Sequence, residues 1–295
     1  MLGMPKNVRQ SLRGRLRAYW TLIKSLQALL LLITGLAGYL SARCPVTTLP
    51  ALLALAGSLF LSISGSTVLN MYFDRDIDAR MGRTCQRPLP AGLVAPWEAL
   101  TLGLILSVAG VAWACLVTPL YGTVIAAGVF FDVVVYTMWL KRRTPYSIVI
   151  GGVAGGMPAL AGRALGVGRI DIVGLLLALA VLLWIPTHIV TFSMRYHEDY
   201  QRGGIPIFPT IYGFGVARGI IASSTAAASV AMLAVAVAIG MARAHLGLLA
   251  ALSAGLLAVA VVSMARPSQR ADLILFKSAS LYMLGSMVFI VAATV

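Results

Sequence analysis

Long apolar runs dominate this 295-residue chain. A helix needs about 20 mostly apolar residues to cross the hydrocarbon core of a bilayer. Hydrophobic residues make up 60% of the chain and charged residues 11%, against about 25% charged residues in an ordinary soluble domain. The mean hydropathy of +0.92 leaves too little polar surface for a water-soluble globule. We therefore predict an all-α, polytopic membrane bundle of nine transmembrane helices, which cover roughly residues 20–42, 50–72, 96–118, 120–140, 146–166, 172–194, 213–240, 244–265 and 273–294.

The basic residues orient this bundle, because cytoplasmic loops carry an excess of Lys and Arg. With the N-terminus in the cytoplasm, 19 of the 23 basic residues fall inside and four fall outside. We predict a multi-pass protein of the cell membrane with a basic cytoplasmic segment at 1–18, one transmembrane domain at 19–295 and the C-terminus outside. We expect no cleavable signal peptide, since the first 18 residues are polar and basic. The bilayer is an expected partner and nucleic acid is not, because the basic residues lie in short loops between apolar runs.

The rare acidic residues gather in two clusters. The chain has nine acidic residues and five of them lie in these clusters, both in predicted cytoplasmic loops. In the first cluster, Asn70, Asp74 and Asp78 are spaced four residues apart, so on a helix they share one face, and Asp76 points roughly the other way. One amide oxygen and two carboxylates suit Mg²⁺, which takes few protein ligands and is completed by waters and phosphates. A solvated loop is the alternative.

Basic residues follow this first cluster. Arg83 and Arg87 come soon after it, and arginine is suited to bidentate phosphate binding. Lys141 and Arg142 follow the fourth predicted span. Each of these residues either binds phosphate or only helps to orient the protein in the membrane.

The second cluster is the adjacent pair Glu198 and Asp199, close to Arg195 at the end of the sixth predicted span. Two acidic sites on one membrane face, each with arginines nearby, suit a polyanion held through metal ions, and a diphosphate is the simplest such ligand. The alternative is an ordinary acidic helix end. The glycines and the proline that follow predict that the helix stops there.

Two polar residues fall inside predicted spans. Asp132 lies in the fourth span, and an acid at membrane depth is a candidate functional residue. It could instead pair with a basic residue such as Lys24. His188 lies near the end of the sixth span, where a lone histidine either has a structural role or contacts a ligand.

Four sequence motifs resemble the UbiA superfamily of intramembrane prenyltransferases. The first is the stripe N-x-x-x-D-R-D-I-D from Asn70, followed by R-T-x-x-R-P-L-P-x-G from Arg83. The second runs from Tyr136 through Lys141 to Pro145 and on to Pro158. The others are Trp184-x-Pro186-x-His188 and the stretch from Glu198 to Pro209. The adjacent Glu198 and Asp199 make the chain most similar to the branch that prenylates haem. The resemblance covers roughly residues 19–290.

This resemblance implies a function and a site. The fold would be nine helices around a lipid-accessible cavity, with loops and short helices capping it on the cytoplasmic side. Mg²⁺ would be the cofactor and a farnesyl or geranylgeranyl diphosphate the donor. The acceptor would be a vinyl group of haem B, giving haem O, or a 4-hydroxybenzoate-type or other lipid acceptor. A secondary transporter is a remote alternative. The expected metal ligands are Asn70, Asp74, Asp78, Glu198 and Asp199, and the expected substrate-binding residues are Lys24, Arg83, Arg87, Asp132, Tyr136, Lys141, Arg142, His188 and Arg195.

Overall fold

The structure is a computed structural model that describes residues 12–42 and 48–294. Residues 1–11 of the predicted basic segment 1–18 therefore lie outside the described part, whereas its last residues are helical. The described residues form helices and no strands. The helices are α1 (Leu12–Ile23), α2 (Ser25–Leu40), α3 (Leu49–Phe73), α4 (Arg75–Asp78), α5 (Pro96–Val117), α6 (Pro119–Phe130), the π-helix η1 (Phe131–Leu140), α7 (Ser147–Gly151), α8 (Val153–Val167), α9 (Ile172–Arg195), α10 (His197–Gly203), α11 (Phe208–Ala238), α12 (Arg243–Ala265) and α13 (Gln269–Ala292).

The helix count agrees with the predicted all-α membrane bundle. Eight helices in the described part of the chain are long and apolar enough to cross a membrane, and α1 with α2 makes a ninth if this bent pair is one span. The two helices of that pair meet at 45°. The bend lies at Lys24, whose backbone is left-handed with φ of 48°, a conformation that is uncommon for a residue other than glycine.

Local sequence explains where several helices begin. The side chain of Thr118 accepts a hydrogen bond from the backbone N–H of Tyr121, and Pro119 occupies the first turn of α6. Proline is tolerated there because that turn has no internal partner for its N–H. Asp171 caps α9 in the same way by accepting from Gly174 N at 2.8 Å. These caps allow short connections, such as the one-residue link at Thr118 between α5 and α6.

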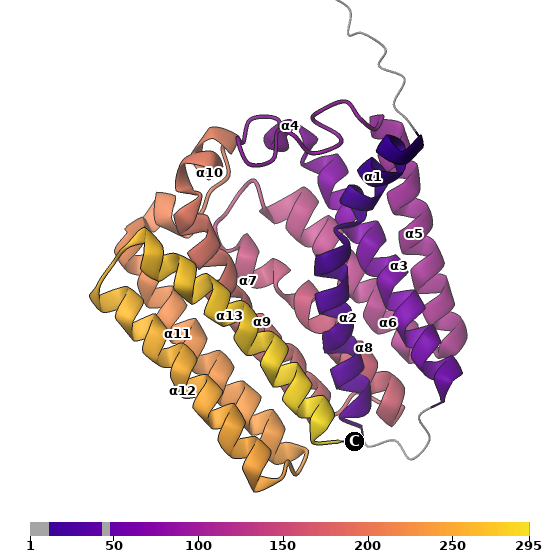
Figure 1. The fold of residues 1–295 in the computed structure, drawn as a ribbon. Helices are drawn as coiled ribbons and strands as arrows, with labels where there is room; N and C mark the ends of the chain where they lie inside the picture. Colours follow the sequence, from indigo (N-terminus) through magenta and orange to yellow (C-terminus); the bar gives the residue numbers. More distant parts are fainter. Residues whose placement is uncertain (1–11, 43–47, 295) are drawn as a thin grey trace, which may run out of the picture.

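Small residues hold the helices close together. The long helices lie side by side in one bundle, with α11, α12 and α13 at one side of it and α5 at the other (Figure 1). A Cβ atom on Gly162 of α8 would lie 1.9 Å from the carbonyl oxygen of Gly35 on α2, and one on Gly38 would lie 2.1 Å from that of Ala159. Helix packing inside a membrane depends on such close approach, because lipid is as apolar as the side chains.

Two partly buried ion pairs tie the bundle together. Arg163 of α8 binds Asp171 at 2.7 Å and also donates to Ser41 after α2. Arg218 of α11 binds Asp272 of α13 at 2.7 Å. Ser263 of α12 and Asp272 accept from the same guanidinium. A charge in a membrane protein is costly unless it is paired, so these pairs act as links between helices.

The short helices α4 and α10 lie at the same end of the bundle (Figure 1). A small apolar cluster joins the loops that carry them and is made of Ile77, Met81, Ile205 and Ile207. The family resemblance implied loops and short helices at this position as a cap. We refer to this end of the bundle as the cap end.

Candidate active site

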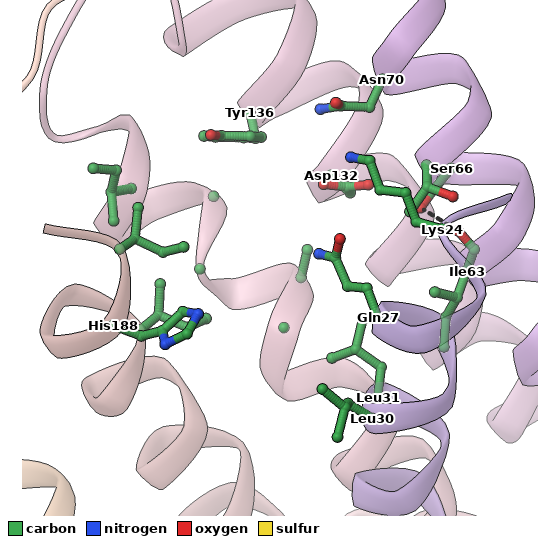
Figure 2. A pocket seen from close by; sticks show the side chains of 18 of the residues that line it. Lys24, Gln27, Leu30, Leu31, Ile63, Ser66, Asn70, Asp132, Tyr136 and His188 are labelled. Atoms are coloured by element: carbon green, nitrogen blue, oxygen red, sulfur yellow. Dashed lines mark hydrogen bonds between the residues drawn. The ribbon is translucent and has the colours of Figure 1, made fainter. Parts of the chain in front are cut away.

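A cavity of about 840 Å³ lies inside the bundle. Figure 2 shows Asn70, Tyr136, Asp132 and Lys24 around one part of it, and Leu30 and Leu31 around another part. The cavity therefore joins a polar chamber to an apolar one. Nine of the residues that we predicted from the sequence line it, namely Lys24, Asn70, Asp78, Arg83, Arg87, Asp132, Tyr136, Lys141 and His188.

The first acidic cluster keeps its helical register across a break. Helix α3 ends at Phe73 and α4 begins at Arg75. The backbone N–H of Asp74 nevertheless donates to Asn70 O at 3.0 Å, and that of Asp78 donates to Asp74 O at 2.8 Å. The four-residue spacing therefore leaves all three side chains on one face. Asp74 is 1% exposed and Asp78 is 4% exposed.

Cations neutralise both buried carboxylates. The ammonium of Lys141 donates to Asp74 Oδ2. Arg87 Nη1 donates to both oxygens of Asp78, at 2.9 and 2.7 Å. Asp74 Oδ1 is buried and has no hydrogen-bond partner among the described residues. Such an orphaned acceptor is costly. Asp74 itself does not line the cavity, so a ligand would reach this oxygen only if neighbouring side chains moved.

Asp76 faces away from the cavity, as the helical spacing predicted. Its side chain is 51% exposed and binds Arg142 at 2.6 Å. Hydrogen bonding from Arg142 lowers the pKa of Asp76 below its ordinary value. Arg142 also donates to Phe73 O. The structure therefore places Arg142 on the outer side of the acidic cluster, outside the cavity lining.

The π-helix η1 brings two predicted residues to the cavity. Asp132 and Tyr136 both lie on this 10-residue segment. Thr137 donates from its hydroxyl to Asp132 O at 2.7 Å and accepts from Asn70 Nδ2 at 2.8 Å. The amide oxygen of Asn70 stays available because its nitrogen is used in this way. In Figure 2, the ammonium of Lys24 points toward Asp132.

The second acidic cluster lies in the cap and does not line the cavity. The carboxylate of Asp199 accepts from the backbone N–H groups of Gly82 and Arg83, both at 3.1 Å. The side chain of Glu198 is 83% exposed and lies 3.5 Å from Arg202. Asp199 thereby anchors the loop that carries Arg83, whose guanidinium lies 4.7 Å from the centre of the Phe192 ring. Arg195 is exposed at the end of α9, away from the cavity.

His188 lies in the apolar chamber, across the cavity from Gln27 and Leu31 (Figure 2). Its ring stacks between Trp184 and Phe276, with centroid distances of 4.8 and 4.4 Å. Four further residues near the cavity were not predicted from the sequence: Phe276, Ser280, Gln27 and Thr137. Phe276 and Ser280 are four residues apart in the last predicted span, so a shared helix face was the available signal. The sequence does not show which other helix that face meets.

The donor atoms of the acidic stripe suit Mg²⁺. In the described ranges, no three His, Cys, Asp or Glu side chains converge on one point as a ready-made metal centre. Asn70, Asp74 and Asp78 offer oxygens alone, and Asp74 Oδ1 is a buried acceptor without a partner. Mg²⁺ prefers oxygen ligands and keeps several sites for water and substrate phosphate. The stripe therefore fits this ion.

Comparison with known proteins gives the family. The model of the UbiA prenyltransferase family matches residues 31–285. The chain belongs to the UbiA prenyltransferase family. It is therefore a membrane-embedded prenyltransferase, as the four sequence motifs indicated.

Two relatives in this family are named protoheme IX farnesyltransferase. The relative from Archaeoglobus fulgidus is 45% identical over 213 residues, which are 72% of this chain and 75% of that protein. The relative from Pyrobaculum neutrophilum is 39% identical over 263 residues, which are 89% of this chain and 94% of that protein.

A solved UbiA structure has the same fold. It is a UbiA homologue from Archaeoglobus fulgidus bound to GPP and Mg²⁺, and it superposes with a TM-score of 0.70 at 16% identity. The match covers 93% of this chain and 99% of that one. At this identity the likeness concerns the fold, and it agrees with the bundle around a central cavity described above.

Proposed function

We propose that this UbiA-family protein transfers an isoprenyl group from a farnesyl or geranylgeranyl diphosphate to a vinyl group of haem B, giving haem O. The observation that carries the proposal is the similarity over 89% of the chain to a protoheme IX farnesyltransferase. The cavity supports it, because a polar chamber with cations opens into an apolar chamber within one continuous cavity. The two chambers match a charged headgroup and an apolar chain with its acceptor.

The polar chamber would hold the diphosphate. Lys24 and Arg83 line it and, among the described residues, have no carboxylate within ion-pair distance. They can therefore meet the phosphate oxygens without first giving up an ion pair. Arginine suits this task because its planar fork binds two oxygens at once. Lys141 and Arg87 hold the carboxylates of the stripe and would adjust when a ligand takes those oxygens.

The stripe would hold Mg²⁺ through Asn70, Asp74 and Asp78. When bound, the ion neutralises charge that develops on the leaving diphosphate. Glu198 and Asp199 remain our predicted second pair of ligands. The contacts of Asp199 with Gly82 and Arg83 add a positioning role, because they hold the loop that brings Arg83 over the cavity.

The apolar chamber would hold the prenyl chain and exclude water. The allylic C–O bond breaks and its electron pair leaves with the diphosphate. The π-electrons of the vinyl group then form the new C–C bond, and water adds to the resulting cation beside the porphyrin with loss of one proton. Exclusion of bulk water from the donor carbon prevents simple hydrolysis of the diphosphate.

The membrane orientation is part of the proposal. The N-terminus and the cap end would face the cytoplasm, where a water-soluble diphosphate headgroup reaches the polar chamber. The C-terminus would lie outside. The excess of basic residues predicted on the cytoplasmic side supports this orientation.

The test is product analysis with the purified full-length protein. Farnesyl and geranylgeranyl diphosphates are each incubated with haem B or with 4-hydroxybenzoate, and products are identified by mass spectrometry. We expect a prenylated haem that requires Mg²⁺ and disappears when EDTA is added. A prenylated 4-hydroxybenzoate without a haem product would replace haem by an aromatic acceptor. No transfer with any pair would contradict the proposal and favour a transporter.

A further inference from the structure

We propose that His188 binds the iron of the porphyrin acceptor as an axial ligand, through its Nε2 atom. This inference deepens the proposed function and rests on it. It concerns the apolar chamber, where His188 lines the cavity away from the acidic stripe (Figure 2). The iron in question belongs to the substrate and is not a resident metal.

The ring of His188 is held in one plane by its neighbours. Trp184 stacks on it at 4.8 Å with an interplanar angle of 22°, and Phe276 stacks on it at 4.4 Å with an angle of 24°. Trp184 is fixed in turn, because its indole N–H donates to Ala279 O at 2.8 Å. Two helices, α9 and α13, therefore set the orientation of the imidazole before any ligand arrives.

A hydroxyl group selects the tautomer of this ring. Ser280 Oγ lies 3.3 Å from His188 Nδ1 and 3.1 Å from Phe276 O. A carbonyl oxygen can only accept, and the hydroxyl of Ser280 carries a single proton. When that proton goes to Phe276 O, which is the shorter of the two contacts, Ser280 Oγ accepts the proton of His188 Nδ1–H. This assignment leaves the lone pair of the neutral ring on Nε2.

The lone pair on Nε2 has no hydrogen-bond partner among the described residues. The side chain of His188 lines the cavity. A neutral imidazole whose other nitrogen donates to a fixed acceptor is the usual arrangement of a histidine that binds a metal. Haem iron is commonly held by one such histidine.

The surroundings favour a porphyrin over a small aromatic acid at this position. An aromatic carboxylate needs a cation nearby. Lys141 and Arg87 are held at the acidic stripe, and Lys24 points toward Asp132 in the polar chamber. Arg83 lies over the rings of Phe192 and Tyr196, which are four and eight residues beyond His188 toward the cap end. The other side of the apolar chamber offers Leu30 and Leu31 (Figure 2). We place the flat apolar ring of the acceptor, with its central metal, between these leucines and the imidazole.

The test is the optical spectrum of the purified full-length protein titrated with haem B and, separately, with metal-free protoporphyrin IX. The two probes share one ring, but only haem has an iron to bind. We expect wild type to bind haem with a Soret band typical of histidine ligation, and at least about tenfold more tightly than protoporphyrin IX. His188→Ala should lose the band and the preference, while added imidazole restores the band. Binding of inorganic diphosphate, which occupies only the polar chamber, should not change.

A control and a second variant make the result specific. His245→Ala removes a histidine at the start of α12, outside the cavity lining, and should leave the haem spectrum unchanged. Ser280→Ala removes the acceptor of Nδ1–H, and we expect a loss of about tenfold in haem affinity, as for other residues that orient a metal ligand. Ser280 is a positioning residue, so the KM for haem should rise while the KM for the diphosphate stays constant.

The outcomes separate this inference from the proposed function. If wild type makes prenylated haem but His188→Ala keeps the Soret band and the preference for haem, the ligand role is wrong and the function stands. If His188→Ala affects only prenylation of a hydroxyaromatic acceptor, His188 is a hydrogen-bonding residue and the inference is overturned. If wild type neither binds haem nor yields prenylated haem, both proposals fail.

Discussion

At the scale of single residues, the acidic stripe offers a matched pair of variants. Asp78→Asn removes a buried carboxylate that faces the cavity, and Asp76→Asn removes one that is half exposed and faces away. We expect Asp78→Asn to lower kcat/KM for the diphosphate by about 100-fold or more, as is typical when one electrostatic contact to a developing charge is lost. Asp76→Asn should change it by less than about fivefold, within the small effect of an exposed ion pair. Steady-state kinetics at saturating acceptor measures both. Equal losses would show that burial on the shared face does not determine function.

Residue spacing predicted which acids share a face but not which cations they meet. The four-residue rule placed Asp74 and Asp78 together and Asp76 opposite, because helical geometry is local. The partners Lys141 and Arg142 come from the turn after η1, more than 60 residues away. Such pairings depend on how helices pack. For the same reason, the sequence could not reveal that Asp199 accepts hydrogen bonds from the loop of Gly82 and Arg83.

At the scale of helices, the close packing of α2 against α8 predicts that a larger side chain at their contact destabilises the fold. A Cβ on Gly162 would lie 1.9 Å from Gly35 O, whereas one on Gly255 of α12 meets no atom within 4 Å. Alanine favours a helix over glycine at both positions by about 1 kcal/mol. Overpacking at Gly162 should outweigh this gain and destabilise the fold by about 1–3 kcal/mol. Gly255→Ala should leave stability unchanged or slightly higher.

Thermal unfolding in detergent distinguishes the two glycine variants. We expect a lower Tm for Gly162→Ala than for wild type, with Gly255→Ala serving as the control for helix propensity. An unchanged Tm for Gly162→Ala would mean that α2 and α8 can move apart without cost.

Apolar run length predicted the helices well, but not their irregularities. Each predicted span corresponds to a helix or to a pair of helices in the structure, because the bilayer fixes their length. The left-handed Lys24, the π-helix η1 and the non-helical Gly213 within α11 were not predicted. Lys24 and η1 turn polar side chains into the cavity. Tertiary contacts, rather than local preference, support such departures from regular helix at functional sites.

At the scale of the whole molecule, the charged residues and the polar chamber of the cavity lie at the same end of the bundle. The acidic stripe, its cations and the short helices α4 and α10 all gather at the cap end (Figure 1). The Arg163–Asp171 pair joins α8 to the start of α9, at the end of the bundle that the sequence assigns to the outside. Positive loops orient a membrane protein during insertion. The same asymmetry would place the polar chamber where the diphosphate is available.

This orientation leads to a prediction that labelling can test. Ala91 lies in the loop after α4, and Ile170 lies in the loop between α8 and α9; both are exposed. In an active background with Cys44, Cys85 and Cys115 replaced by serine, Ala91→Cys should react with an impermeant maleimide in inside-out vesicles alone. Ile170→Cys should react in right-side-out vesicles alone. Detergent should expose both, which controls for access. The reverse pattern would place the cap end outside the cell, and the diphosphate would then have to reach the cavity from the opposite side of the membrane.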